Sequence, residues 1–298
     1  MCVPRVAYPC RWRPNSAWAR RIRRNVSAVK DQAEALLAAI ERRLTGNERT
    51  TEDLDAALAA FRHRATDFVR RYHRLEIDSA VAAPSGPVLF VGNHGFGGIF
   101  DLNVLAAFAA LEDLELDRPV TFLTHQLAWT LGVGPVIEHL GARPASEENA
   151  VSAFAAGHHV MVFPGGDVDA GKSWFHRNDI VFSGRTGFAR LAVEQKVPII
   201  PIVTAGAGDT LFVLSDGKPL AKALRLDKLL RVKALPVSIS VPWGINVGLV
   251  GMLPYLPLPA KMHTRVLPAM TPDEGEDTEA FAVRVHDVMQ EALTEMAT

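Results

Sequence analysis

The chain has 298 residues, of which 48% are hydrophobic and 22% charged, and its formal net charge is −1. This composition supplies enough apolar material for one large domain or two smaller ones and excludes a disordered or fibrous chain. Two cysteines, Cys2 and Cys10, are too few and too close to the terminus for a disulfide framework or a structural zinc site. We therefore expect a protein of a reducing compartment.

The charge is unevenly distributed along the chain. Residues 1–30 carry eight basic side chains and no acid, and we expect residues 1–28 to form a basic tail, either ordered or disordered. No apolar core of a secretory signal follows this tail, so no export is predicted. The longest uncharged stretch, residues 234–260, contains five prolines that would interrupt a membrane-spanning helix.

Two apolar stripes with helical spacing follow the basic tail. They lie within residues 29–44 and 54–68, with a Gly-Asn pair between them. This pattern predicts two amphipathic helices, which form an N-terminal helical hairpin within residues 29–80.

From Pro87 onward, short apolar runs alternate with helical stretches. The runs lie at 87–91, 120–124, 160–163 and 197–203, and a last amphipathic helix is predicted from about 277 to 296. Strands that alternate with helices indicate a parallel sheet. We expect residues 81–298 to form an α/β domain whose mostly parallel sheet is covered by helices on both faces.

The loops after the strands carry the candidate chemistry, because ligands of open α/β sheets bind beyond the carboxyl ends of the strands. The first of these loops places His94 at a strand end and Asp101 at the start of a helix. A histidine that a carboxylate holds in one tautomer is a general base for activating a hydroxyl. The alternative is a structural histidine without catalytic function.

A second loop, Phe163-Pro164-Gly165-Gly166, ends the third apolar run with a sharp turn. Exposed backbone N–H groups of such a turn can bind an oxyanion or a phosphate. We therefore take the N–H groups of Gly165 and Gly166 as candidate oxyanion donors, although a turn of this composition also occurs for purely structural reasons.

Together these loops resemble the phospholipid/glycerol acyltransferase family. Asn93-His94 with Asp101 corresponds to its first motif, and Phe163-Pro164 with the following glycines corresponds to its third. The Val-Pro-Ile-Ile-Pro segment that begins at residue 197 matches a later family strand, and the resemblance covers roughly residues 85–210. Gly141 and Arg143 are candidates for the family element between the first and third motifs.

Two departures from the family pattern bear on the substrate. Six residues separate His94 from Asp101, more than is usual in the family, so their pairing requires the glycine-rich loop to bulge. Gly165 stands where the common third motif has a glutamate. This Phe-Pro-Gly-Gly version is similar to the branch that acts on acylglycerols or other lipid alcohols.

The resemblance implies a direct acyl transfer. His94, oriented by Asp101, would take the proton of an acceptor hydroxyl as it attacks the thioester of an acyl-CoA or acyl-carrier protein. The residues agree, because no cysteine lies near the strand-end loops and no Gly-x-Ser-x-Gly elbow is present. The acyl-CoA is a co-substrate, and we expect neither a cofactor nor a metal.

Basic residues near the expected ligand face have two interpretations. Arg143 and Arg185 are candidate substrate ligands, and they, Lys172 and Arg177 either hold donor or acceptor phosphates or form surface ion pairs. A need for Arg143 and Arg185 would favour the alternative of a lysophosphatidate-type acyltransferase. A non-catalytic lipid-binding protein on the same fold is a further alternative.

The expected acceptor implies contact with a membrane, since a lipid with acyl chains is confined to the bilayer. Without a predicted spanning helix, we expect a cytoplasmic protein that lies peripherally on the inner face of the membrane. The basic start and the apolar stretch around 243–245 and 253–256 are the candidate contacts. No basic folded module indicates nucleic-acid binding.

Overall fold

A computed structural model describes residues 51–95, 101–130, 134–225, 235–241, 244–247 and 256–297. Helix α2 (Thr51–Tyr72) is the second helix of the predicted hairpin. The first predicted helix, at 29–44, and the basic tail lie outside the described residues. No helix among the described ranges is long and apolar enough to cross a bilayer.

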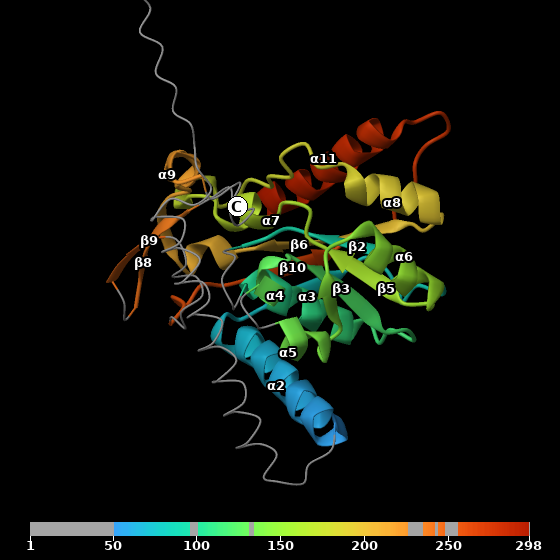
Figure 1. The fold of residues 1–298 in the computed structure, drawn as a ribbon, viewed down its shortest axis with the longest axis horizontal. Helices are drawn as coiled ribbons and strands as arrows, with labels where there is room; N and C mark the ends of the chain where they lie inside the picture. The colour runs from blue at the N-terminus through green and yellow to red at the C-terminus, as the bar shows by residue number, and fades with distance from the viewer. Residues whose placement is uncertain are drawn as a thin grey trace, which may run out of the picture.

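The chain folds around a seven-stranded sheet with the strand order β1-β10-β6-β2-β5-β3-β4 (Figure 1). Five neighbouring strands, from β6 to β4, are parallel, whereas β10 is antiparallel to β6 and pairs in parallel with β1. The predicted mostly parallel α/β fold is therefore confirmed. The strands are β1 (Glu76–Ser79), β2 (Leu89–Gly92), β3 (Val120–Thr124), β4 (Ala142–Pro144), β5 (His159–Val162), β6 (Ile199–Ala205) and β10 (His263–Val266).

Helices cover both faces of this sheet (Figure 1). On one face lie α6 (Glu147–Ala155), α8 (Gly187–Gln195) and α11 (Thr278–Met296). On the other face lies α3 (Leu102–Asp113), against which α2 packs. The other helices of the described residues are short: α4 (Leu127–Thr130), α5 (Gly134–Glu138), α7 (Gly166–Ala170) and α9 (Lys218–Ala223), with 3-10 turns η2 (Trp174–His176) and η3 (Ala207–Asp209).

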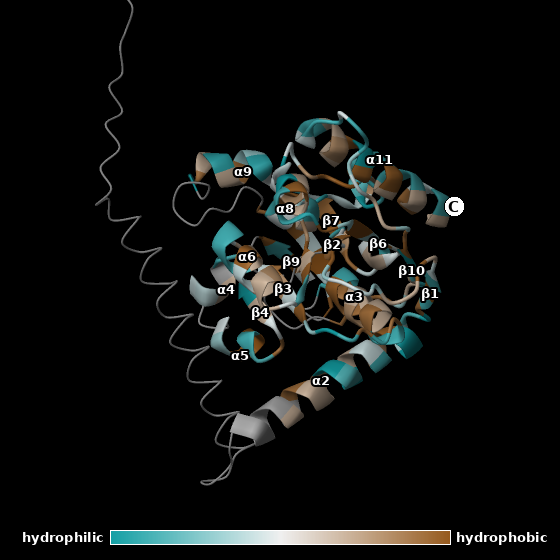
Figure 2. Cartoon of the chain, turned by 90° about the vertical axis from the view of Figure 1, so that its right-hand side faces the viewer, coloured by the Kyte–Doolittle hydropathy of each residue, from teal (hydrophilic) through white to brown (hydrophobic). Residues whose placement is uncertain are grey.

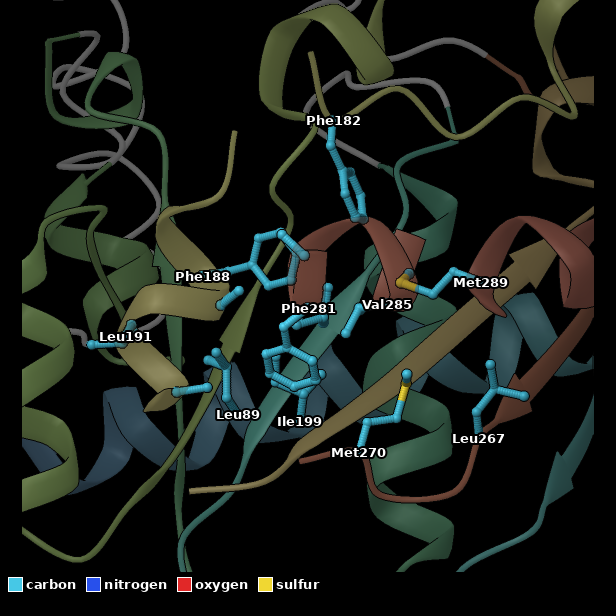
Figure 3. Packing of buried hydrophobic residues seen from close by; sticks show 14 of the residues in the cluster. Leu89, Phe182, Phe188, Leu191, Ile199, Leu267, Met270, Phe281, Val285 and Met289 are labelled. Atoms are coloured by element: carbon cyan, nitrogen blue, oxygen red, sulfur yellow. The ribbon is translucent and has the colours of Figure 1, made fainter. Parts of the chain in front are cut away.

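The core fills the space between the sheet and the helices. Leu89 of β2 and Ile199 of β6 meet Phe281 and Val285 of α11, and all four side chains are buried (Figure 3). Hydrophobic colour is concentrated on the central strands in Figure 2. Burying such aliphatic and aromatic side chains contributes ~1.5–3 kcal/mol each.

Three helices begin directly after a residue whose side chain caps them. Ser146 accepts the Asn149 N–H at the start of α6, and Asp277 accepts the Ala280 N–H at the start of α11. Asp101 likewise caps α3 by accepting the Asn103 N–H (2.9 Å). The cap places the Asp101 carboxylate at the carboxyl edge of the sheet.

Two regions differ from the sequence-based expectation. Strand β1 pairs with β10, so the sheet begins inside the range expected to be a helical hairpin. The strand has four residues and is mostly exposed, and it therefore lacks an apolar pattern. A separate three-stranded antiparallel sheet, β7 (Phe212–Ser215), β8 (Val237–Ser240) and β9 (Gly244–Val247), was also not predicted.

Candidate active site

Three neighbouring strands, β6, β2 and β5, end at the same edge of the sheet, and the candidate site lies there. His94 follows β2 and Phe163 follows β5, and their rings pack with centroids 4.9 Å apart. A Cβ at Gly92 would lie 2.6 Å from the Phe163 ring, so glycine is needed where the two loops approach each other. The structure thus brings the first and third sequence motifs together.

His94 and Asp101 form a direct pair. His94 Nδ1 lies 2.5 Å from Asp101 Oδ2, and Asp101 is buried. Because a carboxylate only accepts hydrogen bonds, Nδ1 carries a proton, and Nε2 is the ring nitrogen that can accept one. Nε2 has no hydrogen-bond partner among the described residues. The pairing expected from the sequence is present despite the six intervening residues, of which 96–100 lie outside the described ranges.

The histidine loop is fixed to the neighbouring strand β6. Asn93 donates from Nδ2 to the Thr204 carbonyl oxygen (3.0 Å) and accepts the Thr204 N–H at Oδ1 (2.9 Å). Asn103 donates to the Asn93 carbonyl oxygen (2.9 Å). These buried bonds hold the strand end that carries His94.

A buried ion pair holds the His94 backbone from the other side. Asp169 Oδ2 accepts the His94 N–H (2.8 Å), and Lys172 Nζ donates to the His94 carbonyl oxygen (3.1 Å). The two side chains bond each other at 2.9 Å, and both are buried. Lys172 also donates to the Asp179 carbonyl oxygen (2.7 Å). Lys172 is therefore neither a phosphate ligand at the surface nor a surface ion pair.

The Phe-Pro-Gly-Gly turn is held by a hydrogen bond within its own backbone and by hydrogen bonds from Arg185. The Gly166 N–H donates to the Phe163 carbonyl oxygen (3.2 Å), which engages one of the two candidate oxyanion donors within the turn. Arg185 donates to the carbonyl oxygens of Pro164 and Gly165 and to the Asp167 carboxylate. Arg185 thus braces the turn. The Gly165 N–H is the candidate donor that remains.

Arg143 lies apart from this cluster. It belongs to β4, two strands away from β5 in the sheet, and donates to the carbonyl oxygens of Glu138 (3.3 Å) and Ala142 (2.9 Å). It shares no hydrogen-bond partner with Arg185. The structure does not join the two arginines into one basic cluster.

Arg177 and His159 have structural contacts. Arg177 pairs with Asp209 (2.6 Å) and stacks over the Trp174 ring. His159 is buried and accepts the Val88 N–H at Nδ1 (3.2 Å). Burial lowers the pKa of His159 below its ordinary value.

Sequence reasoning missed the role of Asp169, Lys172, Asn103 and Thr204. Asp169 lies three residues before Lys172, a spacing that places both side chains on one face of a helical turn. That spacing is a weak signal, because most such pairs are solvated. Only the fold shows that this pair is buried beneath His94.

Part of the chain matches a known protein family. Residues 70–205 match the family model described as Acyltransferase, and this range contains His94, Asp101 and the Phe-Pro-Gly-Gly turn. The match covers somewhat less than half of the chain and shows that residues 70–205 are similar to the Acyltransferase family.

The curated relatives of the chain are distant. An uncharacterized protein of Mycobacterium leprae is 26% identical over 90% of this chain and 73% of its own length. The "DGAT1/2-independent enzyme synthesizing storage lipids" of Gallus gallus is 27% identical over 63% of this chain and 54% of its own length. "Phytyl ester synthase 1, chloroplastic" of Arabidopsis thaliana is 26% identical over 46% of this chain and 20% of its own length. The chain therefore spans only part of each of these relatives.

Among solved structures, the chain is similar to the 1-acyl-sn-glycerophosphate (LPA) acyltransferase PlsC from Thermotoga maritima. The similarity covers 93% of this chain and 98% of that chain, with 12% identity and a TM-score of 0.48.

Proposed function

We propose that this acyltransferase moves a fatty acyl group from an acyl-CoA thioester to the hydroxyl of a neutral lipid alcohol, such as an acylglycerol. The observation that carries the proposal is the contact between His94 Nδ1 and Asp101 Oδ2. It leaves Nε2 as a base at the carboxyl edge of a parallel sheet, where substrates of such folds bind.

The reaction needs no covalent enzyme intermediate. His94 Nε2 takes the proton from the acceptor hydroxyl while the hydroxyl oxygen attacks the thioester carbonyl carbon. The tetrahedral intermediate then collapses, the C–S bond breaks, and the imidazolium returns the proton to the thiolate. An ester and a free thiol result. Asp101 stabilises the imidazolium, and the Gly165 N–H is our candidate donor to the oxyanion.

Three observations support a neutral acceptor. Arg185 is bound to the turn and to Asp167, and Arg143 is bound to carbonyl oxygens near β4, so neither is arranged with the other to hold a phosphate. The names of two relatives refer to storage lipids and to a phytyl ester. The glycine at position 165 points to the same branch of the family.

The test is release of free thiol from long-chain acyl-CoA in the presence of a panel of acceptors. The panel contains monoacylglycerol, diacylglycerol, a long-chain alcohol and lysophosphatidate, and acyl-carrier protein replaces CoA in a parallel series. We expect turnover with a neutral alcohol and loss of turnover in His94→Ala. The control His263→Ala removes a histidine that pairs with an exposed aspartate, Asp78, at 2.7 Å.

Each other outcome of the panel contradicts part of the proposal. Turnover with lysophosphatidate alone would indicate a lysophosphatidate-type enzyme. Transfer only from acyl-carrier protein would exclude the acyl-CoA donor. No turnover with any pair of substrates would favour a lipid-binding protein without catalytic activity.

A further inference from the structure

Strands β8 and β9 of the small sheet β7-β8-β9 have their polarity reversed. A one-sided antiparallel sheet of a water-soluble protein buries apolar residues and exposes polar ones. Here Ser238, Ser240 and Asn246 are buried, whereas their apolar neighbours in the strands point outward. We call the outward surface the apolar face; it consists of Phe212, Leu214, Ile239, Val241, Ile245 and Val247.

The strand register aligns the apolar face into rows. Phe212 of β7 lies opposite Ile239 of β8, which lies opposite Ile245 of β9. Val237 and Val247 form the adjacent pair. Ile245 is 73% exposed and Val247 is 52% exposed. A contiguous apolar surface of this kind on a folded protein indicates an interaction site.

The polar side of the sheet fixes this orientation. Asn246 Nδ2 donates to Ser240 Oγ (2.7 Å) and to the Gly244 carbonyl oxygen (2.8 Å). A one-residue slip would bury the apolar face, but it would also break these bonds and expose their partners. The outward position of the apolar residues is therefore built into the hydrogen bonding of the sheet.

The apolar face is connected to the candidate active site. The Phe212 ring packs against the Trp174 ring, with centroids 5.4 Å apart. Trp174 lies two residues after Lys172, whose ammonium donates to the His94 carbonyl oxygen. Phe175, next to Trp174, is 74% exposed. Figure 1 shows β8 and β9 projecting from the body beside α9. Exposed apolar groups thus extend from the sheet toward the loop that carries His94.

The charge of the adjoining segment identifies the partner. The described part of the connection from β7 to β8, residues 216–225, contains three basic and one acidic side chain. An apolar surface beside a basic segment matches the acyl chains and anionic headgroups of a membrane interface. We propose that the apolar face is the surface by which the protein rests on a lipid bilayer. The proposal extends the proposed function, because it presents the site to an acceptor confined to the bilayer.

The test is co-sedimentation of the full-length chain with vesicles of phosphatidylcholine, with and without phosphatidylglycerol. Val247→Asp places a charge on the apolar face, and the matched control Val283→Asp changes a valine of 57% exposure on α11. We expect Val247→Asp to reduce the vesicle partition coefficient about tenfold, since lipid burial of one valine is lost and a charge must be desolvated. Val283→Asp should bind as wild type does.

High salt distinguishes the contribution of the apolar face to vesicle binding from that of the basic tail. At about 1 M salt the Debye length is roughly 3 Å, so basic segments contribute little and the remaining binding reports the apolar face. Val247→Asp should reduce that remaining binding by the same factor, and Ile245→Asp, a change elsewhere in β9, should do the same. Circular dichroism and thermal melts establish that both variants are folded.

Equal vesicle binding by wild type, Val247→Asp and Ile245→Asp would overturn the proposal. A second result would also overturn it: the wild-type chain forms a dimer that binds no vesicles, and Val247→Asp dissociates this dimer. The apolar face would then contact a second copy of the chain. Vesicle binding is independent of catalysis, so His94→Ala should bind vesicles as the wild type does. A chain that binds vesicles but transfers no acyl group would refute only the proposed function.

Discussion

Lys172 Nζ and Asp169 Oδ1 lie 2.9 Å apart in the interior, and together the two side chains bind both the N–H and the carbonyl oxygen of His94. Asp169 Oδ1 also accepts the Val181 N–H (3.0 Å). The pair therefore joins the histidine loop to the segment that follows α7. Its geometry makes the position of His94 depend on residues more than 70 positions later in the chain.

Asp169→Asn should destabilise the fold by about 3–5 kcal/mol, because it leaves the buried Lys172 ammonium without its counter-ion. Asparagine also has a single acceptor oxygen for the bonds that the carboxylate makes. We expect urea unfolding to show the loss, with a decrease in turnover of the variant that remains folded.

The double variant Asp169→Asn/Lys172→Met provides the control for that change. It removes both charges, so it should be more stable than Asp169→Asn alone. If the two single substitutions and the double one show additive free energies of unfolding, the two residues do not interact as the structure describes.

Asp101 has two functions that substitution can separate. Its Oδ2 contacts the His94 ring and its Oδ1 caps α3. Asp101→Asn retains a capping oxygen but cannot stabilise an imidazolium, so turnover should fall strongly while the thermal midpoint changes little. Asp101→Ala should lose turnover and also about 0.5–2 kcal/mol of stability. Wild-type turnover in Asp101→Asn would show that another group orients His94.

Gly165 lies directly against the buried aspartate. A Cβ at position 165 would be 2.2 Å from Asp169 Cβ, a contact that requires one of the two residues to move. Gly165→Ala should therefore lower both stability and turnover. Gly187→Ala is the matched control, since no atom lies within 4 Å of a Cβ there. Comparable thermal midpoints for the two variants would contradict the packing described here.

The sequence predicted the elements whose patterns are local. The four apolar runs at 87–91, 120–124, 160–163 and 197–203 became β2, β3, β5 and β6. Each of these strands is buried, so its apolar run is continuous and distinct from the polar loop that follows it. The pairing of His94 with Asp101 was predictable because both flank one short loop.

Other features depend on contacts between distant segments. Strand β1 is short and exposed, and only its pairing with β10 makes it part of the sheet. In β8 and β9 the apolar residues alternate as in any strand, but no local pattern tells which side is buried. Likewise, Asp169 and Lys172 have the composition of a solvated helical turn, and their burial follows from the packing of the loops around them.

Two buried histidines should make stability depend on pH. Burial lowers the pKa of both His73 and His159 below the ordinary value of 6.5. Below that value the unfolded chain binds protons that the folded chain does not, so the free energy of unfolding falls as the pH decreases from about 6.5. Urea unfolding between pH 8 and pH 5 measures this slope.

Asparagine substitutions isolate the histidine contribution to that slope. In His73→Asn the amide can donate to the Ala260 carbonyl oxygen as Nδ1 does, and in His159→Asn the amide oxygen can accept the Val88 N–H. The double variant should show a shallower loss of stability toward acid. An unchanged slope would mean that other groups cause the acid sensitivity.

The most direct test of the account is the turnover of His94→Ala with acyl-CoA and the best neutral acceptor of the panel. General base catalysis contributes about 10²–10⁴-fold, so we expect kcat to fall by that factor, with a thermal midpoint and vesicle binding close to those of wild type. The control His263→Ala should retain wild-type kcat. A folded His94→Ala variant with near wild-type kcat would contradict the assignment of His94 as the base.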